Sequence, residues 1–262
     1  ERVDKTCAHL LQGRVVIIYN GSPYALILPV TLFDFIASPE DVNLNYHFSN
    51  LLKFIRGLAF FITLLLPGLY LAITIYHREL IPTELLYSIV ATRVNVPFPI
   101  ILEVLMMELS FELIREAGLR VPSPLGSTVG IVGALVLGEA AVSANIVSPI
   151  LIIVIAITAI SSFAIPDFSI SFHLRISRFA YTILGSLCGF LGIGIGLFIH
   201  ILILNSLKSF GVPYLSPYAP LSPIGNNSYF LKPVWKREKR ASFLNTKKPF
   251  TQERISMKWR EK

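Results

Sequence analysis

Acidic side chains recur along one stretch of the sequence at the spacing of a helix face. Glu108, Glu112 and Glu116 are four residues apart, so a helix would place them on one side. Glu139 and Asn145 follow in a stretch that carries almost no other charge. Several copies of such carboxylates around a narrow passage would stabilise cations and repel anions. We therefore take five residues as a candidate ion pathway: Glu108, Glu112, Glu116, Glu139 and Asn145.

These acidic groups also have structural explanations. The face formed by Glu108, Glu112 and Glu116 could be solvated, with local pairing between Glu112 and Arg115. An ionisable group inside a membrane span costs about 2.5 to 3.5 kcal/mol unless it meets water or a partner. Glu139 could therefore face water or another subunit, could be held neutral by burial, or could reach the membrane interface from the end of a span.

Small residues recur every four positions in two apolar stretches. Such a pattern leaves one helix face nearly bare, so that a second helix backbone can come close. The residues concerned are Gly130, Ala134 and Gly138 in the first stretch and Gly185 and Gly189 in the second. We expect these five positions to pack against another helix, within or between subunits.

The sequence contains no recognisable catalytic or metal-binding constellation. The glycines from Gly192 to Gly196 lie in an apolar run, not between a strand and a helix, so they do not indicate a dinucleotide loop. The five histidines are scattered, and Cys7 and Cys188 are the only cysteines. We predict no enzyme activity, no cofactor and no metal site.

The elements that position these residues are predicted from long runs without charge. The chain of 262 residues is 53% apolar and only 15% charged, which excludes a cytosolic enzyme, a disordered tail and a disulfide-rich secreted domain. A helix needs about 20 apolar residues to cross a bilayer. Runs of about this length or longer contain no Asp, Glu, Lys or Arg: residues 57–76, 121–138, 140–166 and 179–207.

We therefore predict an all-α polytopic membrane domain. It has about four transmembrane helices, at about 51–76, at two places within 126–166 separated by a break near 145–149, and at about 179–206. An amphipathic membrane-associated helix is expected at 97–117. A β hairpin around the turn Asn20–Pro23 precedes these helices, and we interpret it as the remainder of a truncated soluble domain.

The net charge of +7 belongs to the end of the chain. Residues 232–262 carry eleven Lys or Arg against three Glu. Basic residues beside a span mark the cytoplasmic side and favour contact with anionic lipid, so we expect a cytoplasmic tail that binds no nucleic acid. The expected division is 1–48 for the end of an amino-terminal cytoplasmic domain, 49–208 for the membrane domain, 209–231 for a Pro-rich surface segment and 232–262 for the tail.

Several sequence blocks together resemble one family. Their order and spacing over about residues 13–223 are similar to those of the A subunit of the spore germinant receptors. The blocks are Gly21–Pro23, Phe33–Phe35, Ser38–Asp41, Pro82–Leu86, Pro97–Pro99, Glu103–Glu108, Phe111–Gly118, Ile131–Val136, Ser161–Pro166 and Phe210–Tyr214.

The resemblance implies a protein of the spore inner membrane that works with a transporter-like B subunit and a lipoprotein C subunit. It also implies a homo-oligomeric, pentameric ion channel that is gated by nutrient bound on the B subunit. Glu139 lies in a block where the family has Gln or Glu. Two rival functions remain beside this one: a secondary transporter, which normally has more spans and broken helices, and a non-conducting membrane scaffold.

Overall fold

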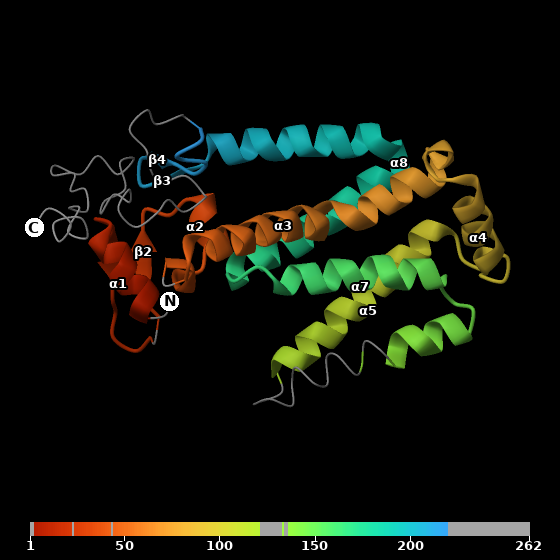
Figure 1. Cartoon of the computed structure of the whole chain (residues 1–262), viewed down its shortest axis with the longest axis horizontal. Helices are drawn as coiled ribbons and strands as arrows, with labels where there is room; N and C mark the ends of the chain where they lie inside the picture. Colours follow the sequence, from red (N-terminus) through yellow and green to blue (C-terminus); the bar gives the residue numbers. More distant parts are fainter. Residues whose placement is uncertain (1–2, 23, 43, 121–132, 134–135, 220–262) are drawn as a thin grey trace, which may run out of the picture. The chain divides into compact units, whose positions relative to one another are not determined.

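The computed structural model describes residues 3–22, 24–42, 44–120, 133 and 136–219, and helices dominate this part of the chain (Figure 1). The helices are α1 (Val3–Leu11), α2 (Leu32–Ile36), α3 (Tyr46–Ile75), α4 (Thr83–Arg93), α5 (Ile100–Arg120), α7 (Pro149–Phe163) and α8 (Phe168–Ser206). Residues 136–143 are also helical. Single 3-10 turns occupy Pro39–Val42 and Arg78–Leu80, and the strands are β1 (Val15–Ile17), β2 (Leu26–Leu28), β3 (Lys208–Ser209) and β4 (Val212–Pro213).

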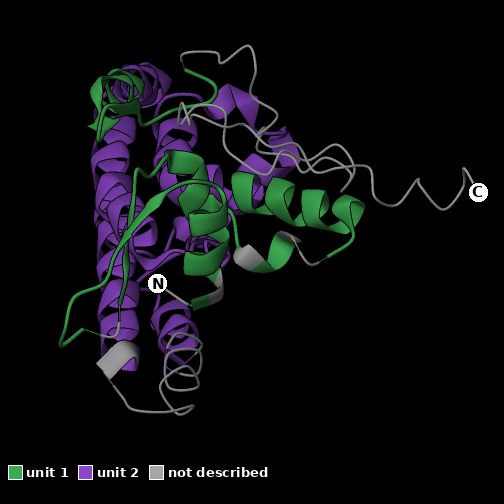
Figure 2. Ribbon diagram, turned by 90° about the vertical axis from the view of Figure 1, so that its left-hand side faces the viewer, with its two compact units in different colours: residues 1–57, 199–262 green, residues 58–198 purple. Residues whose placement is uncertain are grey.

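The chain divides into two compact units, coloured separately in Figure 2. The first comprises residues 1–57 and 199–262, and the second comprises residues 58–198. The short segment after α8 therefore belongs to the same unit as the segment before α3.

The predicted hairpin is confirmed in the first unit. β1 pairs antiparallel with β2, with Val16 opposite Ile27. Beside it, the buried Arg14 guanidinium donates two hydrogen bonds of 2.7 Å to the two carboxylate oxygens of Asp34. Asp34 also accepts hydrogen bonds from the backbone N–H and the hydroxyl of Thr31, at 2.8 and 2.7 Å. This bidentate pair fixes the start of α2 to the chain before the hairpin.

The chain that follows α8 packs on the chain that precedes α3. The backbone N–H of Leu32 donates to the carbonyl of Tyr214 at 3.0 Å, and the N–H of Val30 donates to the Ser209 hydroxyl at 3.2 Å. The rings of Phe33 and Tyr218 lie 4.9 Å apart. The two ends of the helical region are therefore joined within the first unit.

Two of the described helices, α3 with 30 residues and α8 with 39, are long and apolar enough to cross a membrane. α7 is apolar but has 15 residues, about 22 Å of helix, which is short for a bilayer of about 30 Å. A break between the helical residues 136–143 and α7 occurs where the sequence predicted it. The predicted helix at 97–117 is present as α5. The four transmembrane helices stay a prediction.

α8 is not the single straight span that the sequence predicted at 179–206. It begins at Phe168 and breaks at Gly189, whose φ of 61° and ψ of −141° lie outside the helical range. A Cβ added at Gly196 would lie 2.9 Å from Leu184 and 3.1 Å from Tyr181. Residues 15 apart meet only if the helix doubles back, so α8 is a hairpin of two helices (Figure 1).

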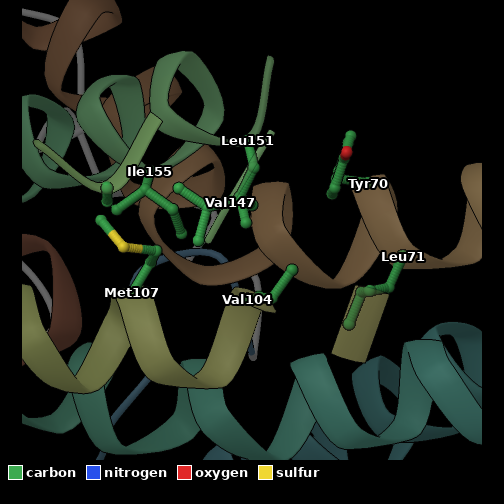
Figure 3. Close-up of a cluster of buried hydrophobic side chains, with 8 residues drawn as sticks. Tyr70, Leu71, Val104, Met107, Val147, Leu151 and Ile155 are labelled. Atoms are coloured by element: carbon green, nitrogen blue, oxygen red, sulfur yellow. The ribbon is translucent and has the colours of Figure 1, made fainter. Parts of the chain in front are cut away.

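A buried apolar cluster holds α3, α5 and α7 together in the second unit. Figure 3 shows Tyr70 and Leu71 from α3 near Val104 and Met107 from α5. The remaining members of the cluster come from the helical segment 136–143, from the break and from α7: Ala141, Val147, Leu151 and Ile155. Close packing of these side chains fixes the orientation of α5 relative to α3 and α7.

Candidate functional site

The acidic face of α5 lies against arginines of α8. Glu108 and Arg178 are both buried, and Nε of Arg178 lies 3.2 Å from Oε1 of Glu108. The hydroxyl of Thr182, one turn further along α8, lies 3.4 Å from the same oxygen. α8 therefore provides one oxygen of the Glu108 carboxylate with an ion-pair partner and a hydroxyl.

Glu112, one turn further along α5, forms a second pair with α8. Its Oε1 accepts a hydrogen bond from Arg175, and its Oε2 lies 3.9 Å from Nη2 of Arg178. Arg115, on the same face of α5, donates to the Ser162 hydroxyl of α7. Its guanidinium also stacks over the ring of Phe163, 4.0 Å from the centroid. Arg175 and Arg178 thus compensate the two carboxylates within one subunit, and Arg115 is held by α7 instead.

Sequence reasoning did not anticipate these partners. The sequence offered Arg115 as one possible local partner of Glu112, and it indicated no partner on α8 for Glu108 or Glu112. In the structure Arg175 and Arg178 are buried in the first half of α8. Their spacing of three residues, matched to carboxylates four apart on α5, was the signal that could have revealed them.

Glu103 is a further buried carboxylate that the sequence analysis did not single out. Its Oε1 accepts a 2.7 Å hydrogen bond from Arg93 at the end of α4. Its Oε2 accepts a 3.2 Å hydrogen bond from the backbone N–H of Ser148, just before α7. Glu103 therefore fixes the end of α4 and the start of α7 to α5. This arrangement is structural, since both oxygens are used inside the fold.

Glu139 and Asn145 lie in a different environment. Within the helical segment 136–143, Gly138 and Ala141 are buried, whereas Glu139, Ala140 and Ser143 are exposed. Asn145 follows in the break with a positive φ of 54° and is exposed too. This surface is small and polar, although α7, which follows it, is almost wholly apolar. The fifth candidate, Glu116 near the end of α5, is also exposed.

The small residues lie at different kinds of contact. Gly130 and Ala134 fall outside the described residues, and a Cβ added at Gly138 would meet Ile152 at an ordinary 3.4 Å. Gly185 lies against the backbone carbonyl of Gly68 in α3, with no room for a Cβ. The structure thus brings α3 and α8 together at two glycines, one of which, Gly68, was not among the predicted packing residues.

Gly189 serves the reversal of α8. A Cβ there would lie 3.0 Å from the ring of His77, which also packs on Phe190 with the ring centroids 4.5 Å apart. The hydroxyl of Tyr76 is 2.6 Å from the carbonyl of Leu187 and 3.1 Å from that of Ser186. These carbonyls end the first half of α8, so Tyr76, directly after α3, caps the broken helix.

The described residues, 3–22, 24–42, 44–120 and 136–219, contain no group of three His, Cys, Asp or Glu side chains that could hold a metal ion. The two cysteines, Cys7 and Cys188, are free and exposed.

Two helices that are long and apolar enough to cross a membrane, together with an ion pair buried between α5 and α8, are typical of a helical, membrane-associated protein. Residues 1–243 match the family described as Bacillus/Clostridium GerA spore germination protein, and the chain belongs to this family. The resemblance noted in the sequence is confirmed.

Among its relatives, spore germination protein KA of Bacillus subtilis (strain 168) is 46% identical over 241 residues, which are 92% of this chain and 44% of that protein. Spore germination protein GerLA of Bacillus cereus is 46% identical over 220 residues, 84% of this chain and 45% of that protein. The uncharacterized membrane protein YfkQ of Bacillus subtilis (strain 168) is 42% identical over 90% of this chain and 46% of that protein. The chain thus spans about half the length of these relatives. No solved structure matches it.

Proposed function

We propose that the chain is the membrane part of a nutrient-responsive germination receptor subunit that forms a cation-conducting channel in the spore inner membrane. Five copies would assemble around the path. A transporter-like B subunit that binds the nutrient would gate it, together with a lipoprotein C subunit. The carboxyl-terminal tail would lie in the cytoplasm. Family membership supports the germination role.

The observation that carries the channel proposal is the exposed polar surface of residues 136–145. The side chains of Glu139, Ser143 and Asn145 are exposed in the single chain, directly before the apolar helix α7. Facing lipid, a carboxylate would be costly, whereas a water-filled path or a neighbouring subunit would satisfy it. A ring of five such surfaces would line a narrow path with carboxylates and amides, which favours cations.

The ion pairs of α5 narrow the set of residues that would line this path. The carboxylates of Glu108 and Glu112 are already compensated by Arg178 and Arg175 in the same subunit. These two carboxylates therefore attract a passing cation only weakly. Glu139 and Asn145 become the principal pathway candidates, with Glu116 as an additional one.

Replacement of the Glu139 charge tests the proposal. We expect Glu139→Gln to weaken cation preference and Glu139→Lys to abolish or reverse it, because the sign of a charge ring decides which ion is stabilised. The measurement is the reversal potential of the full-length, reconstituted receptor in asymmetric salt with nutrient present. Glu84→Gln, an exposed carboxylate of α4, is the matched control. Unchanged selectivity in Glu139→Lys would contradict the proposal.

A secondary transporter is the second candidate function, and the break in α8 favours it. Helices interrupted within the membrane form substrate sites in many transporters, and α8 is interrupted at Gly189. A transporter would show saturable, coupled uptake at low rates, and a channel would pass ions down their gradient at high rates. A receptor that shows neither with nutrient would be a scaffold for its partner subunits.

A further inference from the structure

The two ion pairs between α5 and α8 form a ladder. Arg175 and Arg178 are three residues apart on α8, and Glu112 and Glu108 are four apart on α5. Both spacings place the two residues of each helix on one face. Arg178 also reaches toward Glu112 at 3.9 Å, so the pairs are linked. The four side chains therefore act as one unit that attaches α5 to α8.

Such a unit has two favourable states. Buried charges are tolerated when paired, and they are tolerated again when water reaches both, but a half-separated pair is costly in between. The ladder therefore favours either a closed, dry arrangement of α5 on α8 or an open, hydrated one. Because only these two arrangements are favourable, a small change in free energy can shift the protein from one to the other.

The closed arrangement is incompletely satisfied. Oε2 of Glu108 is buried and makes no hydrogen bond within the part of the chain that the structure describes. The contact of Oε1 with the Thr182 hydroxyl is long, at 3.4 Å. A buried acceptor without a partner is unfavourable, and water would satisfy it if the helices parted. This lowers the cost of opening at the ladder.

The rest of α8 is attached elsewhere. Its residues near Gly185 touch the backbone of Gly68, and the hydroxyl of Tyr76 binds the carbonyls of Ser186 and Leu187. In the first half of α8, residues near Gly185 contact α3 and Tyr76, whereas Arg175 and Arg178, nearer the start of the helix, form the ladder with α5. Movement of α8 relative to α5 would concentrate at the ladder, because backbone contacts such as that of Gly185 leave no room to slide.

We propose that Glu108, Glu112, Arg175 and Arg178 form a latch that holds α5 on α8 in the non-conducting state and separates on activation. The latch rests on the proposed channel function. It acts by positioning α5 and α8, and its four residues need not touch the permeating ion.

Charge neutralisation tests the latch. In Glu112→Gln the buried Arg175 loses its carboxylate, and in Arg175→Gln the half-buried Glu112 keeps only the 3.9 Å contact with Arg178, so the closed state loses stability in both variants. We expect a basal, nutrient-independent ion flux about tenfold above wild type in the reconstituted receptor, since a modest free-energy change shifts a two-state population that far. The swapped variant Glu112→Arg with Arg175→Glu should return the flux to the wild-type level. Glu84→Gln is the neutral control.

Two results would overturn the latch. One is wild-type basal flux in both single variants when they assemble normally. The other is loss of assembled receptor in both single variants without recovery in the swapped variant, which would make the ladder a fixed strut of the fold.

A second measurement does not depend on ion flux or on removing a charge. Thr182→Cys is a small change next to Glu108, and Ser186→Cys lies one turn away on the side of α3. Both are made with Cys7 and Cys188 replaced by Ser. A charged, water-soluble thiosulfonate reacts with a thiolate, so its rate reports hydration. We expect nutrient to raise the rate about tenfold in the Thr182→Cys variant and to leave the rate in the Ser186→Cys variant unchanged.

The two measurements separate the latch from the channel. If wild type carries no nutrient-dependent current while the thiol introduced at position 182 becomes reactive with nutrient, the channel proposal fails and the movement at the ladder stands. If wild type conducts with nutrient and the reactivity of that thiol stays constant, the latch is wrong and the channel proposal stands.

Discussion

Arg14 and Asp34 show how one ion pair organises the first unit. Burial by itself would raise the pKa of the Asp34 carboxyl. The Arg14 charge and the hydrogen bonds from Arg14 and Thr31 outweigh burial, so the pKa of Asp34 lies below its usual value. A carboxyl whose folded-state pKa lies below its unfolded-state value, about 3.9, stabilises the fold above that pH. The contribution disappears as the pH falls through the folded-state pKa.

Asp34→Asn should therefore destabilise the first unit in a pH-dependent way. We expect the free energy of unfolding to fall by about 3 kcal/mol at pH 7, because the buried Arg14 guanidinium loses the carboxylate that compensates its charge. The difference from wild type should shrink as the pH falls below about 4. Thermal unfolding of the purified chain in detergent between pH 7 and pH 3 measures both effects.

The exposed carboxylate variant Glu79→Gln provides the comparison for that series. A deficit in Asp34→Asn that stayed constant over the whole pH range would show that the ion pair is not the source of the stability.

At the scale of elements, the crossing of α3 and α8 depends on two glycines. A Cβ at Gly68 would lie 2.6 Å from the carbonyl oxygen of Tyr181, and a Cβ at Gly185 would collide with the carbonyl of Gly68. Backbone atoms cannot move aside as side chains do, so the two helices would have to separate. Gly194, in the second half of α8, has no atom within 4 Å of an added Cβ.

Gly185→Ala should lower the free energy of unfolding by about 2 to 3 kcal/mol, whereas Gly194→Ala should leave it unchanged or raise it by up to about 1 kcal/mol, because alanine favours a helix more than glycine does. The measurement is the thermal unfolding midpoint of each variant in detergent, compared with that of wild type. Both substitutions add one methyl group. Equal midpoints would place α3 and α8 further apart than the structure has them.

The capped end of the first half of α8 gives a milder prediction. Tyr76→Phe removes the hydroxyl that binds the carbonyls of Ser186 and Leu187, and we expect a loss of about 1 kcal/mol. Tyr87→Phe in α4, whose side chain is exposed, should have no effect. Hydrogen exchange of the amides around Gly189 would show local loosening in the first variant alone, and equal protection in both would argue against the cap.

At the scale of the whole molecule, the first unit contains both the segment before α3 and the segment after α8. The carbonyl of Tyr214 and the ring of Tyr218 contact residues 32 and 33. If this contact between the two ends forms outside the bilayer, as we propose, both ends lie on the same side of it. The chain between them would then cross the membrane an even number of times.

Site-directed labelling tests this topology. In a background without Cys7 and Cys188, cysteines introduced at the exposed residues Asn20 and Lys208 should react with an impermeant thiol reagent from the same side. The Tyr87→Cys variant, after α3, should react from the opposite side if α3 crosses. Labelling of positions 20 and 208 from opposite sides would require an odd number of crossings.

The sequence by itself determined the local elements and the family. Charge-free runs and a helical period predicted α3, α5 and the break before α7, because these features depend on neighbours within a few turns. The hairpin around Asn20–Pro23 follows from turn residues between two apolar runs.

Only the tertiary structure decided which distant residues meet. Arg175 and Arg178 look like interfacial charges in a linear sequence, and the packing of α8 on α5 buries them opposite Glu112 and Glu108. Gly189 resembles the packing glycine Gly185, yet it reverses the chain. Helical periodicity identifies the face on which a residue lies, but the partner of that face depends on how helices far apart in the chain pack together.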